Sequence, residues 1–258
     1  MEALAQILNY GEPALVSAFI VLMRVGSVTA LLPGFGEQSI PMRIRLLIAL
    51  AFTAIVWPVV SPGISTSLQD IPFLMLTEST IGIMIGISIR LIVMALQLAG
   101  SIAAQSTSIA QVAGSGATPD PMPAIGNILV MAGLALVLVS GLHVKAALAL
   151  INSYEVMPPG FFPTGRDVAE WGTAHVASAF DLALTLSAPF IVASFAYNIG
   201  LGAINRAMPS LMVAFIGAPA ITAGAILLLL LSSPILLEFW NGHMDLVLAN
   251  PLGMPNGR

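Results

Sequence analysis

The sequence predicts an all-α polytopic membrane protein with about six hydrophobic helices. First, 58% of its 258 residues are hydrophobic and only 8% are charged, whereas a soluble domain carries about 25% charged residues. Second, the hydrophobic residues form continuous runs of helical length instead of the alternating ~10-residue segments of a membrane barrel. Third, turn-rich stretches separate these runs. Such a chain must bury its surface in lipid or against partner proteins.

The hydrophobic runs set the expected helices, because about 20 apolar residues span the hydrocarbon core. In chain order we expect helices over residues 13–32, 44–60, 73–98, 124–150, 178–200 and 211–237. Prolines lie inside or beside several of them, at Pro58, Pro189, Pro219 and Pro234. Since proline removes a backbone donor, we expect kinked or broken helices. Residues 1–258 are expected to form a single integral membrane domain.

Small residues recur with helical spacing in two of the expected helices: Gly126, Gly133, Ser140 and Ala147 in the fourth, and Gly82 and Gly86 in the third. In lipid, small side chains permit close approach of helix backbones. The pattern therefore indicates close helix contacts, and these lie either within the chain or with other subunits.

Three charged residues lie inside the expected helices: Arg24 in the first, and Glu78 and Arg90 in the third. A charge near the bilayer centre costs about 2.5–3.5 kcal/mol, so each should be paired, hydrated or buried in protein. Glu78 and Arg90 are separated by about 18 Å along a helix, so their partners are expected on other helices or chains. For the arginines, interfacial placement, a structural contact and a pathway role stay open. No second acid is expected to accompany Glu78 inside the membrane, which argues against a proton relay of stacked carboxylates.

Several function classes lack their sequence patterns. The chain has no cysteine, and His143, His175 and His243 are not spaced as metal ligands. It lacks a GxSxG nucleophile, a P-loop and a GxGxxG motif after a strand. With a net charge of −4 and only 8 Lys and Arg, it has no basic footprint for nucleic acid. We therefore expect neither an enzyme nor a bound cofactor or metal.

Two stretches carry a family resemblance. The first, RVGSVTALLPGFGEQSIPMRIRLLIAL, contains Arg24, Arg43 and Arg45, and the second, NIGLGAINRAMPSLMVAFIGAPAITAGAILLL, contains Arg206. QLAGSIAAQ, ATPDP and SYEVMP fall in the same order as like segments of the family. The chain resembles the FliR family of the flagellar type III export apparatus and is similar to injectisome subunits of the SctT type. It departs from the family pattern after Pro209.

The resemblance implies a structural, pore-forming subunit of a protein export gate in the bacterial inner membrane, at the flagellar basal body. It implies kinked hairpins, partly above the bilayer plane, that assemble with FliP-like and FliQ-like subunits. An FlhB-like protein would dock there, and unfolded exported proteins would pass through. The pattern favours a flagellar over an injectisome system without deciding between them. The alternative is a secondary transporter or an ion-conducting membrane protein, although no repeat of paired halves is visible.

The stretch QSTSIAQVAGSGATPD, residues 105–120, is polar, glycine-rich and free of cations between apolar segments. By composition it is a plain loop. The resemblance implies instead that it lines and plugs the lumen of the gate, through Thr107, Gln111, Gly114, Ser115 and Gly116. Hydroxyl and amide side chains suit irregular backbone at membrane depth, and glycines allow hinge conformations.

Three further arginines, Arg43, Arg45 and Arg206, are expected in short loops on one side of the membrane. Two interpretations stay open: contact with lipid headgroups, which would set orientation, and docking onto neighbouring subunits. Together with Arg24, Glu78 and Arg90, they are the candidate subunit contacts or buried charges.

Overall fold

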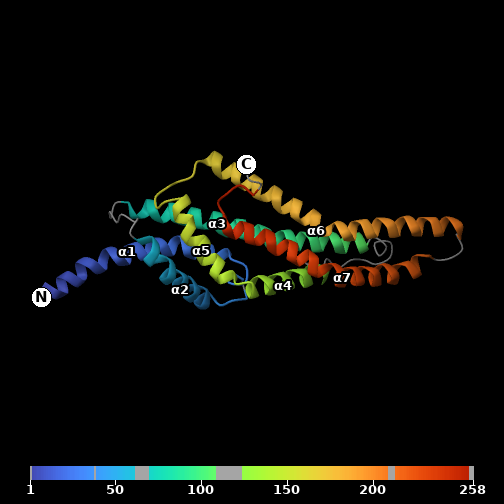
Figure 1. Cartoon of the computed structure of the whole chain (residues 1–258), viewed down its shortest axis with the longest axis horizontal. Coiled ribbons are helices and arrows are strands. Elements are labelled where there is room, and N and C mark those ends of the chain that lie inside the picture. The colour runs from blue at the N-terminus through green and yellow to red at the C-terminus, as the bar shows by residue number, and fades with distance from the viewer. Residues whose placement is uncertain (1, 38, 62–69, 109–123, 209–212, 256–258) are drawn as a thin grey trace. The chain divides into compact units, whose positions relative to one another are not determined.

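The computed structural model describes residues 2–37, 39–61, 70–108, 124–208 and 213–255 (Figure 1). Within these ranges, the side chains of residues 2–12, 107, 108, 124 and 213–219 are not described. The described residues contain no strand and form seven α-helices: α1 (Glu2–Leu31), α2 (Met42–Val60), α3 (Ile71–Ser108), α4 (Ala124–Val139), α5 (Leu142–Val156), α6 (Gly165–Ala207) and α7 (Val213–Ala249).

Five of these helices, α1, α2, α3, α6 and α7, contain stretches long and apolar enough to cross a membrane. Helices α4 and α5 meet the same condition together, as one span broken between them. The predicted class of an all-α polytopic membrane protein with about six hydrophobic segments is therefore confirmed.

The helices extend beyond the apolar runs that predicted them. Helix α3 continues through the polar sequence SIAAQSTS to Ser108, where hydroxyl groups such as that of Ser106 donate to the preceding turn. Helix α6 begins at Gly165, well before the expected residue 178. A reciprocal cap explains this start: the backbone N–H of Asp167 donates to Thr164 Oγ1, and the N–H of Thr164 donates to Asp167 Oδ2. Hydrophobicity alone therefore underestimates both helices.

The prediction of a single helix over residues 124–150 is wrong. The chain breaks at Ser140 and Gly141, and Gly141 adopts the left-handed conformation with φ 84° as the N-cap of α5. Only glycine takes this conformation at little cost. The row of small residues is therefore interrupted, with Gly126 and Gly133 in α4 and Ala147 in α5. The four named prolines, by contrast, lie within continuous helices.

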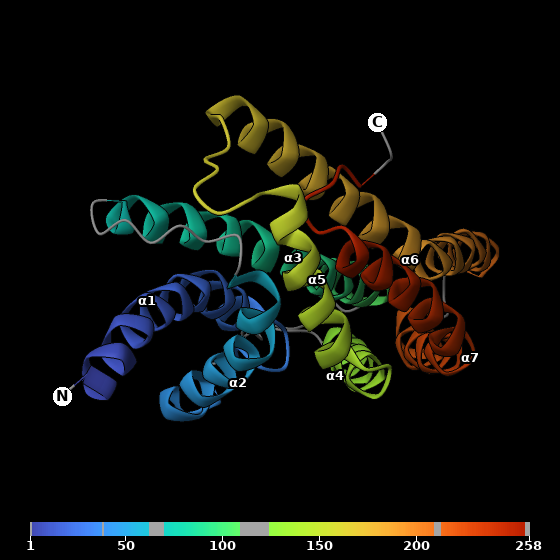
Figure 2. The same ribbon diagram turned by 60° about the vertical axis from the view of Figure 1, so that its left-hand side comes forward.

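The chain forms two compact units, and unit 1 comprises Met1–Leu91, Leu138–Val176 and Met244–Arg258. In this unit α1 packs against α2, and α2 against α5 (Figure 2). The GxxxG glycines of α3 lie against α1: a Cβ at Gly82 would lie 2.8 Å from the Ser27 Cβ, and one at Gly86 would lie 2.7 Å from the Leu31 Cβ. This small-residue pattern therefore serves a contact within the chain.

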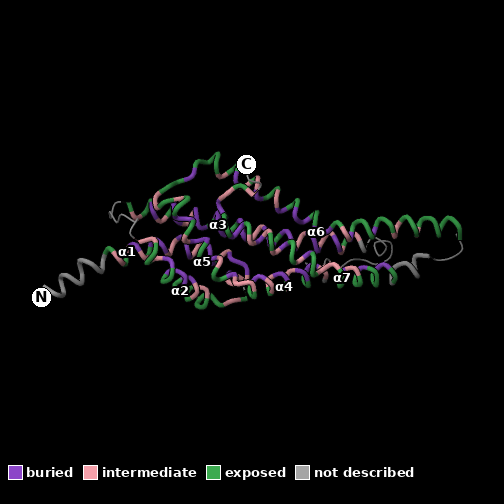
Figure 3. The backbone as a smooth tube through the Cα atoms, in the orientation of Figure 1, coloured by how far each residue is buried: buried purple, intermediate pink, exposed green. Residues whose placement is uncertain are grey.

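Unit 2 comprises Ile92–Val137 and Ala177–His243. Close helix packing again depends on glycine, since a Cβ at Gly100 of α3 would overlap the backbone of Gly126 in α4. Trp240 of α7 is fully buried and donates from Nε1 to the Ile92 carbonyl at 2.8 Å. In contrast, most residues of α6 and α7 whose burial is described in this unit are exposed (Figure 3).

Candidate functional site

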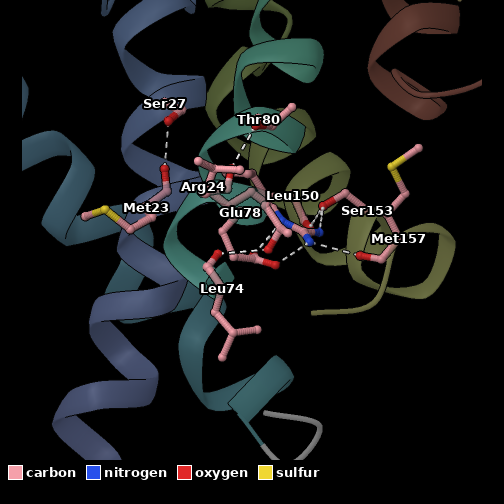
Figure 4. A network of polar contacts seen from close by, with 11 residues as sticks. Met23, Arg24, Ser27, Leu74, Glu78, Thr80, Leu150, Ser153 and Met157 are labelled. Atoms are coloured by element: carbon pink, nitrogen blue, oxygen red, sulfur yellow. Dashed lines mark hydrogen bonds and ion pairs between the residues drawn. The ribbon is translucent and has the colours of Figure 1, made fainter. Parts of the chain in front are cut away.

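A buried charge cluster in unit 1 joins three helices. Arg24 of α1 and Glu78 of α3 are both completely buried. Arg24 Nη2 donates to Glu78 Oε1 at 2.9 Å, and Arg24 Nε lies 2.8 Å from Glu78 Oε2 (Figure 4). This second contact lacks hydrogen-bond alignment and is a charge contact. The structure thus brings together two of the predicted site residues, which are 54 positions apart in sequence.

The same guanidinium reaches the C-terminal end of α5. Nη1 donates to the hydroxyl of Ser153 at 3.0 Å, and Nη2 donates to the carbonyl of Met157, the C-cap residue, at 2.9 Å. The ring of Tyr154 lies below the guanidinium, 3.7 Å from its Cζ to the ring centroid. Carbonyl groups at a helix C-terminus carry partial negative charge and lack helical partners. The cation therefore compensates both Glu78 and the end of α5.

The energetics of this arrangement suit a contact between helices. Desolvating two charges costs several kcal/mol per ion, and only good geometry with further hydrogen bonds offsets that cost. Arg24 meets this condition with three acceptor groups: Glu78, Ser153 and Met157. We interpret the cluster as the contact that sets the mutual placement of α1, α3 and α5.

The other predicted arginines are placed separately. Arg90 is half-buried in α3 and makes no ion pair or hydrogen bond with any described residue. Arg43 and Arg45 lie in the first turn of α2, where Arg45 Nε donates to the Ile40 carbonyl at 3.1 Å. Arg206 is exposed in the last turn of α6. The expectation that the last three lie in loops is wrong, because α2 begins at Met42 and α6 continues to Ala207.

The predicted plug segment is almost entirely outside the described residues. Gln111, Gly114, Ser115 and Gly116 belong to it, and Thr107 lies in the last turn of α3 with only its backbone described. Its role stays a prediction.

Other polar residues were missed by sequence reasoning. The segment SYEVMP, which contains Ser153, Tyr154 and Met157, contributed to the family resemblance. It gave no indication that these residues contact Arg24. Asp181 and Glu238 lie within the long apolar helices α6 and α7, and the expectation that no second acid accompanies Glu78 inside the membrane stays a prediction. An acid inside the run FDLALTL was the available signal for Asp181.

Additional polar contacts hold the C-terminal part of unit 1. Lys145 of α5 and Asp245 of α7 form a partly exposed ion pair at 2.6 Å. The ring of His175 is bonded through Nε2 to the Gly253 carbonyl at 3.1 Å. Across the described part of the chain, histidine and acidic side chains nowhere gather as three or more metal ligands.

Comparison with known proteins identifies the relatives of this chain. The family of bacterial export proteins, family 1, matches residues 15–247. The flagellar biosynthetic protein FliR of Caulobacter vibrioides is 31% identical over 235 residues, which cover 89% of this chain and 94% of that protein. The FliR of Escherichia coli K12 is 27% identical over 86% of this chain and 85% of that protein. The FliR of Aquifex aeolicus is 25% identical, over 91% and 92%.

The matched residues include the Arg24–Glu78 cluster and reach into the last helix, α7. The relatives are flagellar proteins, in agreement with the flagellar system that the sequence pattern favoured over an injectisome. The chain therefore belongs to the bacterial export proteins of family 1, the family of the flagellar biosynthetic protein FliR, and is a membrane component of the flagellar export apparatus.

Proposed function

We propose that this chain is a structural, pore-forming subunit of the export gate, which passes unfolded flagellar proteins across the bacterial inner membrane at the basal body. The observation that carries the proposal is the family match over residues 15–247. The exposed surface supports a role in an assembly. Only 22% of the apolar window of α2, and the same share in α7, is buried within the chain. Such surfaces need lipid or other subunits to cover them.

The lengths of the helices give further support. At 1.5 Å per residue, the 43 residues of α6 and the 37 of α7 extend about 64 and 55 Å along their axes. The hydrocarbon core is about 30 Å thick. Tilt shortens the projection of a helix but does not halve it at the angles that membrane helices adopt. Part of each helix therefore lies outside the hydrocarbon, where apolar side chains need protein contacts.

The proposed partners are FliP-like and FliQ-like membrane subunits, an FlhB-like protein that docks on the gate, and, transiently, the exported proteins. In the proposed gate, residues 1–258 form one export-gate domain. Each gate contains a single copy of this chain. Exposed Arg206 is a proposed subunit contact. Arg206→Ala should then reduce the amount of co-purified partner while leaving the amount of this chain in the membrane unchanged.

Residues 107–118 are proposed to plug the lumen. Their composition supports this role, because serine, threonine and glutamine satisfy irregular backbone and the side chains offer a passing polypeptide no deep pocket. Deletion of residues 113–117 should leave the gate assembled and raise ion leak across the membrane. Deletion of residues 64–68, between α2 and α3, is the length-matched control and should not raise leak. An assembled gate without increased leak after the first deletion would refute the plug.

Native mass spectrometry of the tagged chain, extracted from its own cells in mild detergent, tests the gate itself. The expected result is a complex of one copy of this chain with several copies of two other small membrane proteins. A chain that stays monomeric or forms only a homodimer in several detergents would contradict the proposal and would favour a transporter.

A further inference from the structure

Charged residues are distributed unevenly between the two units. The chain has 12 Asp and Glu and 8 Lys and Arg. In unit 2 four of these residues occur, namely Asp120, Asp181, Arg206 and Glu238. None lies in the parts of α3 and α4 that belong to this unit. Unit 2 is therefore poor in charge, and the charged residues that the structure describes in it are Asp181, Arg206 and Glu238.

The charges of α6 and α7 delimit long uncharged segments. In α6, residues 182–205 separate Asp181 from Arg206 without a charge. In α7, no charged residue precedes Glu238. At 1.5 Å per residue, the uncharged segment of α6 is about 36 Å long, which matches the hydrocarbon core of about 30 Å with a modest tilt.

The uncharged segment of α6 exposes large apolar side chains on one side of the helix. Leu184, Val192, Phe195 and Ile199 recur at near-helical spacing and are 53%, 67%, 67% and 59% exposed. In α7, Leu230 and Leu231 are 70% and 66% exposed. Exposure of these large apolar side chains of α6 and α7 to water would be unfavourable, so an apolar partner must cover them.

A crevice between α6 and α7 opens in the same region. It has a volume of about 270 Å³, and its lining is mostly apolar, with Ala193 on one helix and Ile221 and Leu228 on the other. Such a crevice suits the flexible acyl chain of a lipid. The absence of charge over the length of a bilayer core, with charges at its ends, points to the same partner.

We infer that the uncharged segments of α6 and α7 form a lipid-contacting belt, which places the bilayer core between the level of Asp181 and Glu238 and the level of Arg206. This inference goes beyond the proposed export function, because it identifies which part of the chain contacts lipid.

Spin-label accessibility tests the belt, and the chain suits the method because it contains no cysteine. Single cysteines replace Leu184, Val192, Phe195 and Ile199 on α6 and Leu230 on α7, which are all exposed and tolerate the label. Arg166→Cys, at a side chain that is 84% exposed, provides the reference outside the belt. The labelled chain, with the subunits that co-purify with it, is reconstituted into phosphatidylethanolamine–phosphatidylglycerol vesicles. Collision rates are then measured with oxygen, which concentrates in lipid, and with a water-soluble nickel chelate.

The expected ratio of oxygen to nickel collisions is at least about tenfold higher at Val192, Phe195 or Leu230 than at Arg166, since a polar, water-soluble metal chelate is strongly excluded from the apolar bilayer core. The ratio should also decline from Val192 towards Leu184. High nickel collisions at all three mid-belt sites, or low collisions with both reagents there, would overturn the inference by showing water or protein contact. The subunit composition of the same sample reports separately on the export gate, so the two proposals can fail independently.

Discussion

Glu78→Gln tests the energetic role of the buried cluster. Glutamine keeps the approximate shape and one oxygen acceptor of glutamate but removes the charge that faces Arg24. The guanidinium is fully buried, so no water replaces the lost carboxylate. Removing one member of a buried pair costs about 3–5 kcal/mol. Since Arg24 keeps Ser153 and the Met157 carbonyl as acceptors, we expect the lower end, about 3 kcal/mol.

The matched variants complete a double-mutant cycle. Arg24→Met alone leaves the Glu78 carboxylate buried without a cation and should also cost about 3 kcal/mol or more. In the double variant neither charge remains. Its expected cost is about 1–3 kcal/mol, mainly because the buried Ser153 hydroxyl and the partly buried Met157 carbonyl lose their donor. The double variant should therefore be no less stable than either single one, and far from the sum of about 6 kcal/mol.

The measurement is the free energy of unfolding in mixed dodecylmaltoside–SDS micelles, followed by tryptophan fluorescence, for which the chain supplies three tryptophans. Thr80→Ala is the control, because its exposed hydroxyl donates only to the Leu76 carbonyl of its own helix. A loss below about 1 kcal/mol for Glu78→Gln, or costs of the two single variants that simply add, would refute the description of the pair as a buried, mutually dependent contact.

Three other experiments test particular features of the structure. Exchange of the pair, Arg24→Glu with Glu78→Arg, should not restore stability, since it places a carboxylate against the carbonyl end of α5; a wild-type unfolding free energy would contradict this. Gly100→Ala should cost about 1–3 kcal/mol because its Cβ overlaps the backbone of Gly126, whereas Gly126→Ala, whose Cβ would lie 3.6 Å from its nearest neighbour, should be tolerated in the same assay. Gly141→Ala should cost about 1–2 kcal/mol because φ is 84°, and an unchanged stability would show that the break between α4 and α5 does not need glycine.

The candidate site was only partly predictable. Arg24 and Glu78 stood out as charges in apolar runs, and the need for partners on other helices followed from their cost in lipid. Their pairing with each other did not follow, because a local pattern holds no information on which helices meet. The roles of Ser153 and Met157 depend on where α5 runs, and the break at Gly141 bends α5 by 72° from α4.

Helix boundaries were likewise partly predictable from the local sequence and partly not. The start of α6 was encoded locally in Thr164 and Asp167, whose capping geometry is short-range. The break at Gly141 was not read from the sequence, since glycine also occurs within continuous helices of this chain, at Gly82 and Gly86. There, close packing against α1 explains the missing side chain.

By itself, the sequence determined that the chain is an all-α membrane protein of the FliR family, because hydrophobic run length and motif order are properties of the linear chain. Only the tertiary structure decided that Arg24 and Glu78 neutralise each other and that the GxxxG of α3 packs against α1. It also decided that large apolar side chains of α6 and α7 stay exposed. These outcomes depend on which helix faces meet, and helices far apart in sequence are brought together by packing that no local segment specifies.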